Sequence, residues 1–231
     1  MTFLVASDWH LSPESPEIHG RLAESFLARA RAEGATVVLN GDVFEELFAG
    51  AARARAAHPR VVAQIAALER EGRLLRTRGN HDPGSGEARI VLEVQGLGPV
   101  LVAHGDAADP LHASPIGRLG DVVSRRFGRL AAVRGAARLA ERTARTIAER
   151  PMLRLFRRRC LALVEQERFA LGVFGHVHAA HCVGGDRYVN AGALLGETLD
   201  YVSIDRSGAR LLSLGAAELA RPADGSAPEM G

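Results

Sequence analysis

Four residues, GNHD (79–82), decide the fold prediction for this chain. The segment before them, RLLRTR (73–78), has Leu74 and Leu75 at its centre and is typical of a short strand. GNHD therefore lies where a strand ends, and it places an amide, an imidazole and a carboxylate side by side after a glycine. This mixture of oxygen and nitrogen ligands suits Mn²⁺, Fe²⁺ or Zn²⁺ better than Ca²⁺ or a thiolate-bound metal. The stretch indicates a metal site at the end of a strand.

The same arrangement occurs at other places in the sequence. Short apolar runs at 2–6, 36–39, 100–103 and 171–174 are each followed by a polar cluster: SDWH (7–10), NGDVFE (40–45), HGD (104–106) and GHVH (175–178). Because ligands bind at the carboxyl edge of a parallel sheet, we expect all these clusters to meet at one edge. Each motif alone is commonly accidental, whereas the whole series in this order is not.

The periodicity between these runs predicts an α/β fold. Apolar residues spaced near four predict helices at 17–33 and 60–71, which gives the order β-α-β-α-β, and 180–214 has the pattern of strands and turns in a second sheet. We expect one domain over 1–216, with a helical insertion at about 112–170 and a flexible C-terminal tail at 217–231.

Composition narrows the class of protein. The chain has 231 residues and 47% apolar residues, enough for a sizeable core. No apolar stretch approaches the roughly 20 residues of a membrane span, and the N-terminus lacks the pattern of a signal peptide. Cys160 and Cys182 are the only cysteines and fit reduced thiols. We expect a cytoplasmic protein.

The net charge of +2 conceals an uneven distribution. Residues 117–170 contain 14 arginines and five acidic residues, whereas the rest contains 15 arginines and 22 acidic residues. The basic segment predicts an anionic partner, either a phosphorylated substrate or the inner membrane surface, with nucleic acid not expected. The alternative is a solvated helix face, and for any single arginine we favour that alternative.

The spacing of the polar residues suggests how they would bind. On an extended chain Asp8 and His10 point the same way, so they could hold one ion. His176 and His178 could hold the same ion or one ion each, and Asp42 is placed to bridge two ions. Asn40 and Glu45 flank Asp42 and could support the ligands, as could Asp106, although Glu45 could equally cap the next helix. Asp109 and His112 are close enough along the chain to reach the site, with loop capping as the alternative.

The series D-x-H, G-D-x-x-E, G-N-H-D, H-G-D and G-H-x-H resembles the calcineurin-like metallophosphoesterases from Ser7 to about Asp205. The resemblance implies a four-layer αββα sandwich of two mixed sheets, with the helical insertion forming a lid. It implies that one divalent ion is held by Asp8, His10, Asp42 and His178, and the other by Asp42, Asn80, His104 and His176. His81 would act on the leaving group and Asp82 would orient it, while Asn80 and His81 would contact substrate.

The chemistry implied by this resemblance is hydrolysis at phosphorus. Two divalent cations, with Mn²⁺ expected and Fe²⁺ or Zn²⁺ as alternatives, clamp phosphate oxygens and activate water. A nucleophilic Ser or Cys is not required, and the sequence has no nucleophile elbow.

The stretches SDWHL and GDVFEELF and the insertion are similar to the UDP-2,3-diacylglucosamine diphosphatases of lipid A synthesis, which release UMP and a diacylglucosamine 1-phosphate at the inner membrane. His81 stands where the best-known branch of that family has Arg. The alternatives are a metallophosphoesterase acting on another nucleotide, phosphodiester or phosphomonoester, and a non-catalytic metal-binding scaffold.

Overall fold

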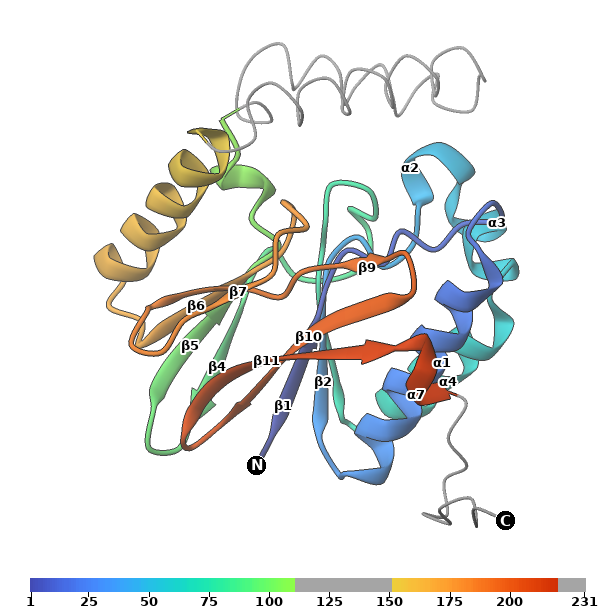
Figure 1. The fold of residues 1–231 in the computed structure, drawn as a ribbon, viewed down its shortest axis with the longest axis horizontal. Coiled ribbons are helices and arrows are strands. Elements are labelled where there is room, and N and C mark those ends of the chain that lie inside the picture. The colour runs from blue at the N-terminus through green and yellow to red at the C-terminus, as the bar shows by residue number, and fades with distance from the viewer. Residues whose placement is uncertain (111–150, 220–231) are drawn as a thin grey trace, which may run out of the picture.

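The computed structural model describes residues 1–110 and 151–219, which form two mixed β-sheets (Figure 1). The first sheet has the order β11 (Gly208–Gly215), β10 (Thr198–Asp205), β1 (Phe3–Ala6), β2 (Thr36–Asn40) and β3 (Leu74–Thr77), with β9 (Leu194–Leu195) paired to β10. Strands β1, β2 and β3 run parallel, and β10 and β11 complete the sheet as antiparallel strands.

The second sheet has the order β4 (Ile90–Val94), β5 (Gly98–Val102), β6 (Leu171–Phe174), β8 (Tyr188–Asn190) and β7 (His181–Cys182). Its three central strands, β5, β6 and β8, are parallel, and the two outer strands are antiparallel to their neighbours. The parallel strands of both sheets direct their carboxyl ends to one end of the molecule, shown at the top in Figure 1.

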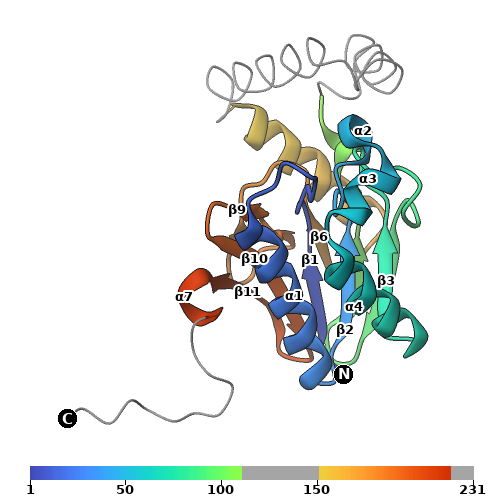
Figure 2. The ribbon, with the colours of Figure 1, turned by 90° about the vertical axis from the view of Figure 1, so that its right-hand side faces the viewer.

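Helices cover the outer faces of both sheets. The first sheet is covered by α1 (Glu17–Ala32) and α4 (Pro59–Arg70) (Figure 2). The short helices α2 (Glu46–Ala49) and α3 (Ala51–Ala56) lie between β2 and α4 in the chain. The second sheet is covered by a helix whose described part is 151–166. A 3₁₀ turn, η1 (Asp106–Ala108), follows β5, and α7 (Ala216–Leu219) follows β11. The predicted αββα sandwich is therefore confirmed.

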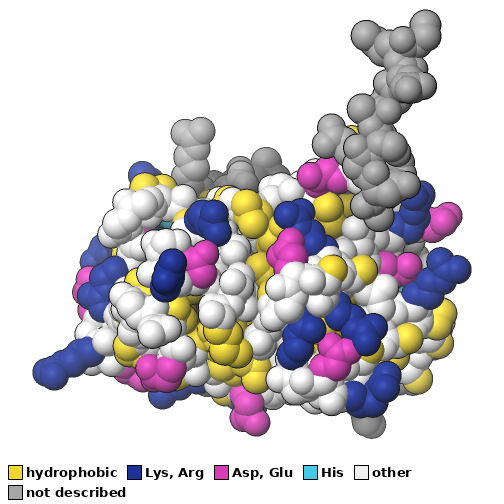
Figure 3. All heavy atoms as spheres, turned by 90° about the horizontal axis from the view of Figure 1, so that it is seen from below, with side chains coloured by type: hydrophobic (Ala, Val, Ile, Leu, Met, Phe, Trp, Pro, Cys, Tyr) yellow, Lys and Arg dark blue, Asp and Glu magenta, His cyan; other side chains and the backbone are white. Residues whose placement is uncertain are grey.

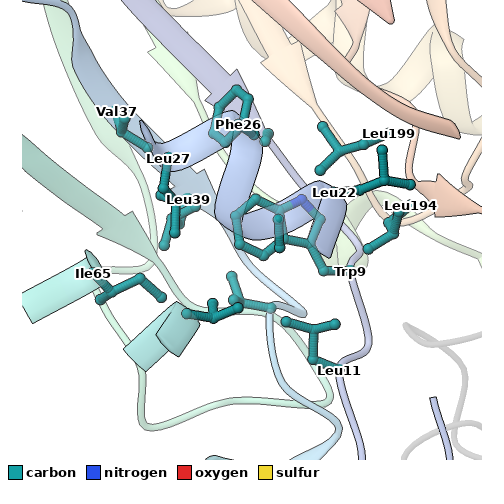
Figure 4. Packing of buried hydrophobic residues seen from close by; sticks show 14 of the residues in the cluster. Trp9, Leu11, Leu22, Phe26, Leu27, Val37, Leu39, Ile65, Leu194 and Leu199 are labelled. Atoms are coloured by element: carbon teal, nitrogen blue, oxygen red, sulfur yellow. The ribbon is translucent and has the colours of Figure 1, made fainter. Parts of the chain in front are cut away.

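Alternation along the strands builds these layers, because successive side chains of a strand point to opposite faces. In β1, Leu4 and Ala6 face α1, while Phe3 and Val5 face the second sheet. The core between helices and first sheet includes Trp9, Leu22, Phe26, Leu39 and Ile65 (Figure 4). The core between the sheets includes Val5, Val38, Val100, Val102, Val173 and Val202.

The fourth layer revises the predicted limits of the insertion. Phe156, Cys160 and Val164 recur every four residues along the helix and pack on Leu101 and Phe174 of the second sheet. The segment 151–166 is thus a layer of the sandwich rather than part of a lid. The remainder of the predicted lid, 112–150, lies outside the described residues.

The predicted strands and helices match the observed ones to within one or two residues, whereas β4, α2 and α3 were not predicted. Strand β4 was missed although four of its five residues, IVLEV, are apolar. The predicted tail begins too early, because 217–219 belong to α7, where Leu219 packs against the first core. The rest of the tail, 220–231, lies outside the described residues.

The opposite end of the molecule has no charge bias on its surface. Figure 3 shows that face, where basic, acidic and apolar side chains are interspersed. No helix in residues 1–110 or 151–219 combines the length and the apolar composition needed to span a membrane.

Candidate metal centre

The loops that follow β1, β2, β3, β5 and β6 meet at the carboxyl end of the sandwich. They carry the predicted ligands, which are all within reach of one another: Asp8, His10, Asp42, Asn80, His104, His176 and His178. The ligand atoms of Asp8, His10 and His178 lie within 4.8 Å of one another, as do those of Asp8, Asp42 and His104. The predicted cluster is therefore present.

The backbone at these positions is unusual. Asp8, His10, Asp42, His176 and His178 all have positive φ angles, between 46° and 67°. The predicted reason for the pairing of Asp8 with His10, an extended chain, is therefore wrong, because both residues adopt the left-handed conformation. This conformation is unfavourable for non-glycine residues and is concentrated at functional sites, where the surrounding structure holds it in place.

Asp8 is the centre of the first group of ligands. Its Oδ1 atom lies 3.1 Å from His178 Nε2 and 3.8 Å from His10 Nε2, and these two imidazole nitrogens are 3.2 Å apart. The other carboxylate oxygen, Oδ2, accepts the backbone N–H of His176 at 2.9 Å. Asp8 is thereby fixed with Oδ1 directed at the two histidines.

Asp42 and Asn80 organise the second group. Asp42 Oδ2 lies 3.2 Å from His104 Nε2 and 3.8 Å from His10 Nε2, so this carboxylate reaches a histidine of each group. Asn80 Oδ1 lies 3.2 Å from both His104 Nε2 and His176 Nδ1. The position of Asp42 between the two groups is the one that a bridging ligand requires.

Gly79 of GNHD and Gly175 are required because the loops that carry the candidate ligands lie very close to one another at these two positions. A Cβ atom at Gly79 would lie 2.0 Å from Asp42 Oδ1, and one at Gly175 would lie 2.0 Å from Ser7 Oγ and 2.5 Å from Asp8 Oδ2. No side chain fits at either position without displacing a carboxylate. Gly79 lets the loop after β3 approach the loop after β2 within the first sheet, and Gly175 lets the loop after β6 of the second sheet approach the loop after β1 of the first.

The site attracts positive charge. Burial opposes ionisation of Asp8 and Asp42, but the surrounding histidines, His104 foremost, hold the pKa of both carboxyls below the usual value for aspartate. Burial likewise opposes protonation of His104, yet Asp42 and Asp8 raise the pKa of its imidazole to about 10. Two ionised carboxylates in a buried cluster need cations, either imidazolium ions or metals.

The residues fit a pair of divalent cations. Asp8 Oδ1 is buried and accepts no hydrogen bond within the described part of the chain, although nitrogen atoms lie around it. His104 donates from Nδ1 to the carbonyl oxygen of Asn40 at 3.0 Å, which leaves Nε2 facing Asp42 and Asn80. An orphan carboxylate oxygen, an amide oxygen and oriented imidazoles are the donor set of borderline divalent ions.

His81 lies beside this cluster and is held by Glu45. Its Nδ1 atom lies 2.9 Å from both carboxylate oxygens of Glu45, and Glu45 Oε2 is also 3.4 Å from His10 Nδ1. Burial opposes charge on Glu45, but the contacts with His10 and His81 lower its pKa to about 2. The Glu45 side chain also accepts the N–H of Phe48 and so caps α2, which was the other predicted role of this residue.

Asp82 has a different place from the predicted one. Its carboxylate accepts three backbone N–H bonds, each 2.9 Å long, from Asp42, Val43 and Gly79. Among the described contacts none joins it to the His81 ring. Asp82 therefore fixes the loop that carries Asp42, and Glu45 instead orients His81. Two of these bonds cross 40 and 39 residues of sequence, so adjacency in GNHD pointed to the wrong partner.

Other residues support the ligands to different degrees. Asn40 does so as predicted, because its carbonyl accepts from His104 and its side chain bonds to Ala103 and Thr77. Asp106 has no side-chain hydrogen bond in the described structure.

Ser7 is a support that was not predicted, and its hydroxyl lies 2.5 Å from Asp8 Oδ2. Asp109 contacts His176, whereas His112 lies outside the described residues.

Comparisons with known proteins give structural matches only. No family model and no curated protein sequence matches the chain. Among solved structures, a predicted phosphoesterase from Streptococcus pneumoniae has 15% identity and a TM-score of 0.43, covering 92% of this chain and 97% of its own. A Vps29 mutant from Entamoeba histolytica has 14% identity and a TM-score of 0.44, covering 93% and 99%.

A mutant of a cold-active protein tyrosine phosphatase has 10% identity and a TM-score of 0.46, covering 92% of this chain and 77% of its own. At these identities and TM-scores the matches assign no activity, substrate or partner to the chain.

Proposed function

We propose that this protein is a two-metal-dependent hydrolase of phosphoric esters or anhydrides. One observation carries the proposal: two buried carboxylates, an amide and four histidines from five separate loops converge, and Asp42 lies between the two groups. Asp8, His10, Asp42 and His178 would hold one cation. Asp42, Asn80, His104 and His176 would hold the other.

The cations, when bound, supply positive charge for the phosphate oxygens and lower the pKa of water. The chain itself provides the preorganised framework, since the left-handed backbone and the bonds of Asp82 hold the ligands before any substrate arrives. The amide oxygen of Asn80 would be an uncharged ligand, so it would leave more of the positive charge of the cations available to an anionic substrate. Preorganised electrostatics of this kind supply a large part of enzymatic rate acceleration.

His81 is placed to move a proton. Burial opposes its protonation, but Glu45 and Asp42 raise the pKa of His81 above its usual value. Glu45 accepts from Nδ1, so Nε2 is the nitrogen left to donate a proton to the oxygen of a leaving group. Phe48 packs edge-on against the ring, with centroids 5.7 Å apart, and restricts its rotation.

For the substrate, we propose the pyrophosphate of UDP-2,3-diacylglucosamine, cleaved to UMP and 2,3-diacylglucosamine 1-phosphate. The support is the arginine content of 117–170 and the motif resemblance. Within the described part of that segment, Arg157 is paired with Asp186 and Arg159 donates to the carbonyl of Ala108. Arg154, Arg158 and Arg168 are exposed. Together with the nine arginines of 118–150, they would bind the anionic substrate or the cytoplasmic face of the inner membrane.

A substrate panel with Mn²⁺ tests both parts. The panel contains the lipid nucleotide, a dinucleoside polyphosphate, a phosphomonoester and a chromogenic phosphodiester, with the Asp42→Asn variant purified identically to expose any contaminating phosphatase. We expect UMP release with a kcat/KM at least about 100-fold above that of the simple esters, a difference of roughly 2.7 kcal/mol in transition-state binding.

The other outcomes separate the alternatives. A higher kcat/KM for the dinucleoside polyphosphate or for a simple ester rejects the lipid substrate and keeps the hydrolase. Absence of turnover on the whole panel by a protein that binds two metal ions rejects the hydrolase and favours the scaffold.

A further inference from the structure

His176 differs from the other candidate ligands because a carboxylate outside both ligand groups holds its far side. Its Nε2 atom lies 2.8 Å from Asp109 Oδ2, and its Nδ1 atom lies 3.2 Å from Asn80 Oδ1. The two side chains of this pair are 9% and 17% exposed, so water competes weakly for the contact.

This contact determines which nitrogen of His176 is available to a cation. A carboxylate can only accept, so Nε2 must carry a proton. Asn80 Oδ1 can likewise only accept, so Nδ1 is the nitrogen that would ligate a cation bound beside that oxygen. His104 is oriented the opposite way, with Nδ1 donating to the Asn40 carbonyl and Nε2 facing the site. Two histidines of one ligand group thus use different nitrogens, each fixed by a different acceptor.

The position of Asp109 is set independently of His176. It follows the 3₁₀ turn η1, and its backbone N–H donates to the carbonyl of Asp106 at 3.1 Å. The turn begins at Gly105, where a Cβ atom would lie 2.8 Å from the ring of Phe156 in the helix 151–166. The second-sheet layer therefore packs against the turn that carries Asp109, and the Asp109 carboxylate in turn contacts the imidazole of His176.

We propose that Asp109 is a positioning residue that makes His176 an Nδ1 ligand of the cation shared with Asn80 and His104. The inference rests on the two-cation site of the proposed function. A carboxylate behind an imidazole fixes its tautomer and orientation and increases its basicity, and loss of such a partner costs 10–100-fold in metal affinity. An ordinary loop-stabilising pair would change thermal stability and leave metal affinity unchanged.

Mn²⁺ binding without substrate tests this inference. Isothermal titration calorimetry gives the affinity of each ion, and electron paramagnetic resonance reports the exchange-coupled Mn²⁺ pair. We expect D109A to weaken one of the two ions by about 10–100-fold and to lose the coupled signal at Mn²⁺ concentrations that fill the wild-type site. D109N, which keeps an acceptor without the charge, should fall between D109A and the wild type.

The chain contains a matched control. Asp186 accepts from His181 Nε2 at 3.0 Å, which is a second aspartate–histidine pair that touches none of the candidate ligands. D186A should leave both Mn²⁺ affinities within twofold of wild type. Nitrogen-15 NMR of the metal-free protein, with the His176 signals assigned from H176Q, should show the Nε2–H tautomer in the wild type and not in D109A.

Three results would overturn the inference. The first is wild-type affinity for both ions in D109A, and the second is an equal loss in D186A. If D109A does not fold, D109N takes its place in the test. Wild-type affinity of D109N for both Mn²⁺ ions is then the third result. A wild-type protein that binds no Mn²⁺ rejects the proposed function together with the inference, whereas two tight ions in every variant reject only the role of Asp109.

Discussion

The two ends of the parallel strands differ in the burial of charged side chains and in backbone conformation. At the carboxyl end, Asp8 and Asp42 are buried charges, and five of the described non-glycine residues adopt left-handed conformations. At the opposite end, Arg168 is the one described non-glycine residue with a left-handed conformation. Other turns there are made by glycines such as Gly34 and Gly72, which have open space around them, and charged side chains lie in solvent (Figure 3). The carboxyl end is thus strained and charged in a way that folding alone does not require, which marks it as the functional end.

The largest difference between the ends should come from Asp42→Ala. Removing the carboxylate that lies between the ligand groups should lower kcat by at least about 10³-fold, since loss of one preorganised electrostatic group already costs 10²–10³. The metal-free variant should unfold at a lower urea concentration than metal-free wild type, because His104 and the backbone N–H of His81 lose the carboxylate that they contact. Retained turnover, or unchanged metal-free stability, would break the comparison.

His81→Ala should have the next largest effect. Loss of a positioned acid typically costs 10²–10⁴ in rate, so kcat should fall in that range while the metal content stays at the wild-type level. Turnover of substrates with very acidic leaving groups should fall less, because those groups need no proton. Loss of metal in this variant would show instead that His81 is a ligand.

Gly79→Ala tests the packing of the carboxyl end directly. The added Cβ would lie 2.0 Å from Asp42 Oδ1, so we expect a loss of roughly 1–3 kcal/mol in the free energy of unfolding, as for other overpacked sites. Gly184 is the matched glycine at the opposite end, in the turn between β7 and β8, with nothing within 4 Å. Gly184→Ala should change stability by less than about 0.5 kcal/mol in the same urea titration.

Glu33→Ala should have the smallest effect. Glu33 pairs with Arg29 at 2.8 Å across one turn at the end of α1, and both side chains are nearly half exposed. Such a pair contributes about 0.3–0.5 kcal/mol, so thermal unfolding should move by only a degree or two and kcat should not change. A loss of stability in Glu33→Ala as large as the loss in Gly79→Ala would show that the two ends of the molecule do not differ in this way.

The sequence predicts the frame of the molecule well because the frame depends on local periodicity. Apolar runs located β1, β2, β3, β5 and β6, and spacing near four located α1 and α4. Strand β4 was missed although four of its five residues are apolar, because so short an apolar run does not by its periodicity distinguish a strand from a buried helix segment. The helix 151–166 was assigned to the insertion because its composition does not reveal which sheet it covers.

The ligand types could be predicted, as could supports next to them in the sequence such as Asn40 and Glu45, but supports from distant loops could not. Each strand end carries its own metal-binding side chains, so local sequence is sufficient for Asp8, Asp42 or His104. The partners of those side chains come from distant loops: Asp82 bonds back to residue 42, and Asp109 bonds forward to His176 across 67 residues. Such pairs depend on how the two sheets meet, and adjacency in the sequence gives no guide to them.

The most direct test of the central claim is a crystal structure of the protein grown with Mn²⁺, with anomalous diffraction measured near the manganese absorption edge. We predict two anomalous peaks about 3.5–4 Å apart, with Asp42 in contact with both, Asp8 and His178 beside one, and Asn80 and His104 beside the other. A structure in which the seven candidate ligands surround no anomalous peak, at Mn²⁺ concentrations that support turnover, would contradict the account.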